Sequence, residues 1–128
     1  MLRRLTPNLM VEDVNKTVQY YEDVLACFEL VAVDPKKGKY DWAMMRCEDV
    51  EIMFQSKDSL IKVIPELDKN EMGGAFVLYI EVEEIGGLYA RIKDKVKIIK
   101  GLHTTPYGMN EFIIQDCNGF IIVFSQWT

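Results

Sequence analysis

The residues able to coordinate a metal ion or act as nucleophiles are few and far apart in this sequence. It contains one histidine, His103, and three cysteines, Cys27, Cys47 and Cys117, with no CxxC spacing. His103 precedes Pro106 in a segment that we predict to be a loop. One imidazole cannot make a site that needs two. An odd number of widely spaced cysteines favours free thiols in a reducing cytoplasm over a disulfide framework.

The composition is that of one globular domain. The chain has 128 residues, 49% of them hydrophobic and 27% charged, so we predict a single domain with its own core. The net charge is −5 and the 15 basic residues are scattered, which argues against nucleic acid and anionic membranes as partners. We expect no signal peptide and no membrane span, because no segment has the roughly 18 apolar residues of a span. A cytoplasmic location is therefore expected.

Two segments of the chain occur twice. The segment LMVEDV at 9–14 is matched by LYIEVEEI at 78–85, with the aligned residues 71 positions apart. The segment EDVEIMF at 48–54 is matched by NGFIIVF at 118–124, 70 positions later. A long period that occurs only twice indicates a duplicated motif and not a solenoid.

Hydrophobic periodicity predicts the same element order, strand, helix and three strands, in each half. The first module covers about 1–58, where Asp13 is expected to cap the helix, a connector covers about 59–74, and the second module covers about 75–128. The expected strands are 5–11, 29–33, 40–46, 50–55, 75–82, 96–100, 109–115 and 120–126, and the expected helices are 13–27 and 84–95.

Alternation along the strands separates a side that faces the helices from an opposite side. In the first strand Leu5, Leu9 and Val11 are expected to face the helix. The opposite side is mixed in character, as in a solvated sheet or a ligand-lined cup. It is expected to carry Thr6, Asn8, Met10, Glu51, Met53, Gln55, Val77, Tyr79, Glu81, Ile121, Val123 and Ser125. Alternation does not fix the facing of Trp42 and Glu111.

Several motifs along the chain have a familiar order. The segment LTPNLMVEDV at 5–14 is followed by Tyr20-Tyr21 and by LACF at 25–28, and the segment YGMNEFIIQDCNGF at 107–120 comes near the end. Together they resemble the vicinal-oxygen-chelate superfamily of glyoxalase, bleomycin-resistance and extradiol-dioxygenase proteins, most closely its bleomycin-resistance-like branch. The resemblance implies an α+β fold in which two paired βαβββ modules form a cup-shaped mixed sheet, with the helices on its outer face.

The resemblance also implies where a divalent metal would be bound. Enzymes of the superfamily take its ligands from the first and last strand of each module, and the matching positions here are Thr6, Met53, Val77 and Val123. These side chains do not build the oxygen and nitrogen sites of Zn, Fe, Mn or Ni. We therefore expect no metal and no other cofactor.

Without metal chemistry, the resemblance implies a homodimeric protein that binds a small molecule. A cationic aromatic antibiotic is one candidate, held by aromatic stacking and by carboxylates. Candidate contacts are Tyr79 and Glu81 on the cup face, Met53 and Val123 on its floor, and Trp42, Tyr107 and Glu111 in its walls. Glu51 beside Glu81 would make the cup acidic.

These assignments have alternatives. Trp42 also fits a core position, Tyr107 a loop anchor, and Glu81 a solvated charge at a sheet edge. The alternative functions are a metal-dependent or cofactor-free lyase, isomerase or dioxygenase of the same superfamily, and a module that binds other proteins. A cofactor-free enzyme would use Glu81 or Glu111 as its general base.

Overall fold

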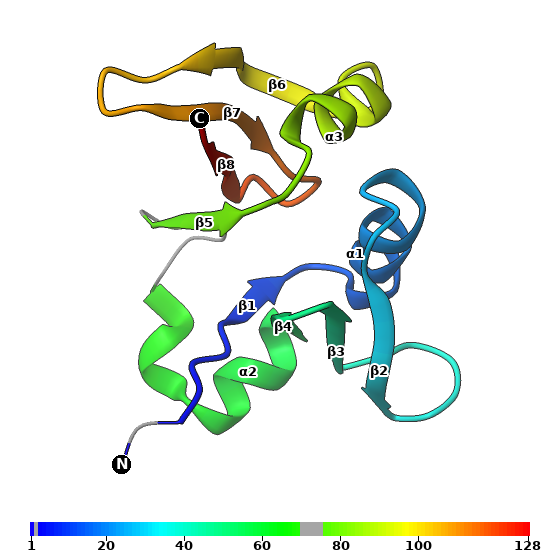
Figure 1. The fold of residues 1–128 in the computed structure, drawn as a ribbon. Helices are drawn as coiled ribbons and strands as arrows, with labels where there is room; N and C mark the ends of the chain where they lie inside the picture. Colours follow the sequence, from blue (N-terminus) through cyan, green and yellow to red (C-terminus); the bar gives the residue numbers. More distant parts are fainter. Residues whose placement is uncertain (2, 70–75) are drawn as a thin grey trace. The chain divides into compact units, whose positions relative to one another are not determined.

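The computed structural model of the protein describes residues 1, 3–69 and 76–128, within which the chain forms two four-stranded sheets (Figure 1). Each sheet belongs to its own compact unit, Met1–Met72 or Gly73–Thr128. The predicted α+β fold of two βαβββ modules is confirmed. The end of the predicted connector, 70–74, and the predicted strand start at Ala75 lie outside the described residues. No described helix is long and apolar enough to cross a membrane.

The first sheet has the strand order β1-β4-β3-β2, in which β1 and β4 are parallel and the other pairs antiparallel. Its strands are β1 (Asn8–Val11), β2 (Glu29–Asp34), β3 (Trp42–Cys47) and β4 (Val50–Ser56). The helical segments of this unit are α1 (Val14–Gln19), the π-helix η1 (Tyr20–Val24), α2 (Lys57–Val63) and the 3-10 helix η2 (Pro65–Lys69).

Asp13 caps α1 as predicted. Its side chain accepts a hydrogen bond of 3.0 Å from the backbone N–H of Lys16, which satisfies one of the unpaired donors of the first turn. The helical run ends at Val24, three residues before the predicted end at about residue 27. After Gln19 the helix widens into η1, closed by a bond of 3.2 Å from Leu25 N–H to the Tyr20 carbonyl.

The core of the first unit lies between α1–η1 and one face of the sheet. Tyr21 is fully buried there, with its ring centroid 4.8 Å from that of Phe54. Leu9 and Val11 face this core, as their alternation predicts. Leu5 is 90% exposed, so its predicted helix-facing position is wrong, because the chain joins the sheet only from Asn8 onward.

The second sheet repeats this arrangement with the order β5-β8-β7-β6. Its elements are β5 (Val77–Glu81), α3 (Ile85–Ile92), β6 (Lys97–Thr104), β7 (Met109–Gln115) and β8 (Ile121–Trp127). Tyr89 of α3 packs edge-on against Phe112, 5.0 Å between centroids, and Phe112 packs in turn on Phe124. Glu84 matches Asp13 in position, but its side chain makes no capping bond. Gln126 Oε1 accepts the bond from Ile85 N–H instead, at 2.9 Å.

His103 lies in β6 and not in the predicted loop. The pairing of β6 with β7 shifts register between Ile98 and Lys100 and again between Lys100 and His103. These irregularities break the alternation that would reveal a strand in the sequence. The strand therefore continues to Thr104, beyond the predicted end at residue 100.

Cys27 and Cys47 form a disulfide, so the prediction of free thiols is wrong for this pair. The two residues are 20 positions apart, yet their Cα atoms are 5.6 Å apart, a distance suited to a disulfide. Cys27 precedes β2 and Cys47 ends β3, and the antiparallel pairing of these strands brings the two together. Cys117 is exposed and is not part of this bridge.

Candidate ligand-binding site

Most of the predicted contacts of the second unit share the sheet face opposite α3. Directly paired residues point to the same side of a sheet. Tyr79 pairs with Val123, and Ser125 pairs with both Glu81 and Glu111. These five residues define what we call the open face of the second sheet, because it is the side opposite α3. Glu111, Val123 and Ser125 are buried within it, whereas Tyr79 and Glu81 are exposed. The structure thereby settles the facing of Glu111, which the sequence left undetermined.

A buried carboxylate lies at the centre of this open face. Glu111 is only 5% exposed. Its Oε2 accepts hydrogen bonds from the Tyr107 hydroxyl, at 3.1 Å, and from the Ser125 hydroxyl, at 3.3 Å. Ser125 is fully buried and was not among the predicted contacts, although alternation had placed it on this side of the sheet. Two hydroxyl donors are a sound way to satisfy a buried carboxylate.

Two tyrosines continue the hydrogen-bonded group to the surface. The hydroxyls of Tyr79 and Tyr107 are 3.4 Å apart, while both residues are more than half exposed. Tyr107 lies in the turn between β6 and β7, so it acts as a loop anchor and also contacts Glu111. Glu81 is exposed at the end of β5. Two aromatic rings at the surface are thus linked, through the Tyr107 hydroxyl, to the buried carboxylate of Glu111.

This arrangement suits a ligand with a positive charge and a flat portion. The faces of phenol rings attract cations and stack on aromatic groups. A carboxylate in a partly dry position attracts a cationic or hydrogen-bond-donating group more strongly than one in bulk water. Glu111 supplies that charge, and Tyr79 and Tyr107 supply the rings.

His103 lies directly opposite Glu111 on the neighbouring strand. Its Nδ1 is 2.7 Å from the carbonyl oxygen of Gly101. A carbonyl oxygen only accepts, so Nδ1 donates in this contact. A half-buried imidazole is therefore on the strand beside the buried carboxylate.

The open face of the first sheet comprises Asn8, Trp42, Met44, Met53 and Gln55. Trp42 is half-buried there and is not part of the core. It pairs with Gln55 in the same register in which Glu111 pairs with Ser125, so Trp42 and Glu111 hold equivalent places in the two modules. Gln55 accepts a bond of 2.9 Å from Asn8, which fixes the polar part of this face.

Glu51 is tied into an ion-paired cluster of the first unit. Its Oε2 accepts bonds from Arg46 Nε, at 3.2 Å, and Nη2, at 2.7 Å, and its Oε1 accepts one from Thr6 at 3.2 Å. Arg4 lies 3.5 Å from Oε1. The Arg46 hydrogen bonds are the main reason that the pKa of Glu51 lies below its ordinary value. Its negative charge is thus offset locally. That Glu51 and Glu81 lie side by side stays a prediction.

The residues at the four family metal positions have no shared coordinating chemistry. Thr6 uses its hydroxyl to bond Glu51, and Met53, Val77 and Val123 are apolar on their strands. Among residues 1, 3–69 and 76–128, no three His, Cys, Asp or Glu side chains come together in a way that could hold a metal ion.

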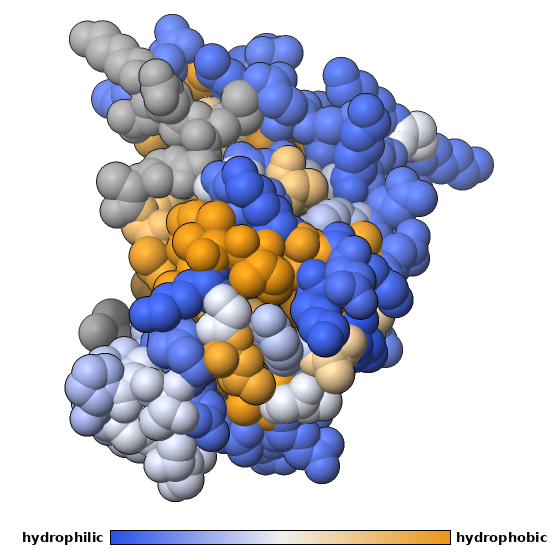
Figure 2. Space-filling model, turned by 90° about the horizontal axis from the view of Figure 1, so that it is seen from above, coloured by the Kyte–Doolittle hydropathy of each residue, from blue (hydrophilic) through white to orange (hydrophobic). Residues whose placement is uncertain are grey.

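Apolar side chains gather on the surface as well. Figure 2 shows hydrophobic residues in the middle of the face seen from above, bordered by hydrophilic ones. The large hydrophobic residues exposed in the second unit include Phe76, Val77, Tyr79, Ile99, Leu102, Tyr107 and Trp127. A contiguous exposed apolar patch is a candidate binding surface.

The fold is shared with several proteins of known structure. TioX from Micromonospora sp. ML1 has a TM-score of 0.78 at 15% identity, covering 99% of this chain and 100% of its own. A glyoxalase/bleomycin resistance protein/dioxygenase from Nocardioides has a TM-score of 0.77 at 16% identity, covering 99% and 86%. The bleomycin-binding protein of Streptomyces verticillus, complexed with copper(II)-bleomycin, has a TM-score of 0.66 at 21% identity, with full coverage of both chains. These likenesses establish a common fold.

The sequence itself identifies the family. Residues 4–124 match the Glyoxalase/Bleomycin resistance protein/Dioxygenase superfamily, and the chain belongs to it. The resemblance noted from the sequence motifs is thereby confirmed. A search of curated protein sequences found no match.

Proposed function

We propose that this protein is a metal-independent binding protein for a small cationic molecule with an aromatic portion. The observation that carries the proposal is the buried Glu111 carboxylate, bonded by Tyr107 and Ser125 and lying below the exposed ring of Tyr79. A cationic group of the ligand would be attracted to Glu111, and its flat portion would stack on the tyrosines.

Two further observations support this choice. Met53, Val77 and Val123 supply no oxygen or nitrogen donor at three of the four family metal positions, and the fourth, Thr6, is bonded to Glu51. A protein of the same fold was solved in complex with copper(II)-bleomycin, which makes a cationic aromatic antibiotic a reasonable first ligand to test. Trp42 and Met53 share the open face of the first sheet and stay predicted apolar contacts.

The proposal includes a homodimer, and the Cys27–Cys47 disulfide removes the free-thiol argument for a reducing cytoplasm. Val77, Tyr79 and Trp127 are 51%, 55% and 65% exposed, and they are the apolar surface that we propose a partner covers. A second copy or the ligand itself would cover it. Sedimentation velocity with and without ligand measures which of the two does so.

A cofactor-free enzyme is the second candidate. The observation in its favour is that His103 and Glu111 are paired on β6 and β7 and point to the same side of the sheet, which would place an imidazole and a carboxylate beside a bound substrate. In that case the ligand would be converted, and product would accumulate in an incubation that a binding protein leaves unchanged.

The deciding experiment is calorimetric titration of protein purified without chelator, alongside elemental analysis for bound metal. The titrants are metal-free bleomycin and copper(II)-bleomycin. The proposal predicts saturable binding to metal-free protein, and weaker binding by Glu111→Gln. Glu22→Gln, an exposed carboxylate of η1, is the charge-matched control and should bind normally. Stoichiometric metal in the purified protein, required for binding, would contradict the metal-independent assignment.

A further inference from the structure

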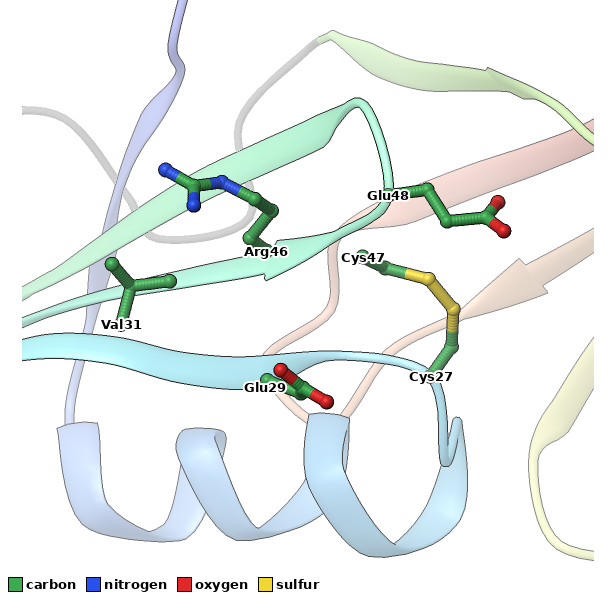
Figure 3. A pocket seen from close by; sticks show the side chains of 6 residues that line it. All are labelled: Cys27, Glu29, Val31, Arg46, Cys47 and Glu48. Carbon is green, nitrogen blue, oxygen red and sulfur yellow. A yellow bond between two sulfur atoms is a disulfide. The ribbon is translucent and has the colours of Figure 1, made fainter.

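The Cys27–Cys47 disulfide forms part of the wall of a pocket in the first unit. The pocket has a volume of about 430 Å³ and is lined by Cys27, Glu29, Val31, Arg46, Cys47 and Glu48. Figure 3 shows the bridge between the start of β2 and the end of β3, with these side chains around it. A volume in this range accommodates a small organic molecule.

The bridge can be reached from solvent. Cys27 is exposed and Cys47 is half-buried. Thiol–disulfide exchange requires a thiolate to approach one sulfur in line with the bond, so exposure decides which sulfur is attacked. Cys27 is therefore the entry point, and Cys47 is the leaving group.

The pocket has an excess of negative charge. Glu29 and Glu48 are both exposed carboxylates in its lining. Arg46 is the one cationic side chain among the six lining residues. Both its Nε and its Nη2 donate to Glu51 Oε2, at 3.2 and 2.7 Å, so its charge is already paired. An approaching molecule meets two carboxylates beside the bridge.

We propose that this pocket is a thiol–disulfide exchange site selective for small cationic thiols. The thiolate of an aminothiol attacks Cys27 Sγ and forms a mixed disulfide, the Cys27–Cys47 bond breaks, and Cys47 leaves as a thiolate that takes up a proton. A second aminothiol thiolate attacks the aminothiol sulfur of the mixed disulfide, which releases the aminothiol disulfide and the Cys27 thiolate. The reverse sequence oxidises the protein with the cationic disulfide as oxidant.

The charge of the lining explains the selectivity. Glu29 and Glu48 attract the ammonium group of the reagent and repel an anionic thiol such as glutathione. Because both carboxylates are exposed, their effect is screened by salt. The selectivity should therefore be largest at low ionic strength.

The test measures oxidation of the reduced full-length chain by cystamine, hydroxyethyl disulfide and glutathione disulfide, which are cationic, neutral and anionic. Cys117→Ser removes the third thiol, and intact mass with peptide mapping follows the Cys27–Cys47 bridge. Rates are divided by those of the same reagents on the urea-unfolded chain, which corrects for their intrinsic reactivity. We expect cystamine to be at least about threefold faster than glutathione disulfide, and salt to abolish the difference.

The matched variant is Glu29→Gln combined with Glu48→Gln. Both residues are at the surface, so the fold is expected to be kept, and the preference for cystamine should disappear. Equal normalised rates for the three reagents in the protein that keeps Glu29 and Glu48 would overturn the proposal. A preference that survives the double substitution would also overturn it, as would stable mixed disulfides on Cys27 without closure of the bridge.

Discussion

The hydroxyl of Tyr107 donates a hydrogen bond of 3.1 Å to Oε2 of Glu111, which links an exposed turn to a buried position on β7. The same oxygen accepts a bond from Ser125 on β8. The carboxylate is therefore oriented by two donors, the exposed Tyr107 and the buried Ser125. This relationship makes the two donors separable by mutation.

Tyr107→Phe should weaken ligand binding by roughly three- to tenfold. It removes one hydrogen bond to a carboxylate and keeps the aromatic ring, and such bonds contribute about 0.5 to 1.5 kcal/mol. Glu111→Gln should weaken binding by about tenfold or more, because the charge is lost as well. Calorimetric titration of both variants and of Glu22→Gln measures the order of their ligand affinities. Full affinity in Glu111→Gln would remove this carboxylate from the site.

Glu51 should make the first unit acid-sensitive. Hydrogen bonds from Arg46, and with smaller effect Thr6 and the charge of Arg4, hold its pKa below the ordinary value of 4.5. A lowered folded-state pKa contributes stability that is complete above the unfolded-state pKa and is lost as pH falls through the folded-state pKa.

Glu51→Gln should therefore lower the urea midpoint at pH 7 and make it less dependent on pH between about pH 5 and pH 2. Glu22→Gln, matched in charge, should keep the pH dependence of the original chain. Urea unfolding followed by circular dichroism at a series of pH values measures both. If the urea midpoints of the original chain and of Glu51→Gln changed with pH in parallel, the ionisation of Glu51 would not contribute to the pH dependence of stability.

Ala26→Gly should stabilise the protein by about 1 kcal/mol. Ala26 ends the first helical segment with φ of 57°, a left-handed conformation that costs a residue with a Cβ roughly 1 to 2 kcal/mol and glycine little. Ala90→Gly, within α3, is the matched control and should destabilise by about 1 kcal/mol. Thermal unfolding compares the two, and a lower midpoint for both variants would argue against strain at Ala26.

Reducing the Cys27–Cys47 bridge should destabilise the protein by about 3 kcal/mol, the loop-closure entropy of a bridge between residues 20 positions apart. The measurement is the urea midpoint with and without reductant in a Cys117→Ser background. Cys27→Ser, which cannot form the bridge, should have the urea midpoint of the reduced protein both with and without reductant. An unchanged midpoint on reduction would mean that the bridge does not constrain the unfolded chain.

The sequence alone determined the duplicated βαβββ pattern and most of the helix-facing positions. Leu9 and Val11, like Ile52 and Phe54, are buried at every second position of their strands, and this spacing can be read from the local sequence alone. The sequence also determined which side chains hold the family metal positions, because the identity of a residue such as Val77 or Val123 does not depend on packing.

Only the tertiary structure decided the facing of Trp42 and Glu111, the position of His103 in β6 and the pairing of Cys27 with Cys47. In FII at 112–114 and in MM at 44–45, apolar residues are consecutive, so alternation gives no facing for their strands. The bulged pairing of β6 hides its periodicity in the same way. Register between strands is set by contacts between residues distant in sequence, and such contacts bring Tyr79 to Tyr107 and Glu111 to Ser125.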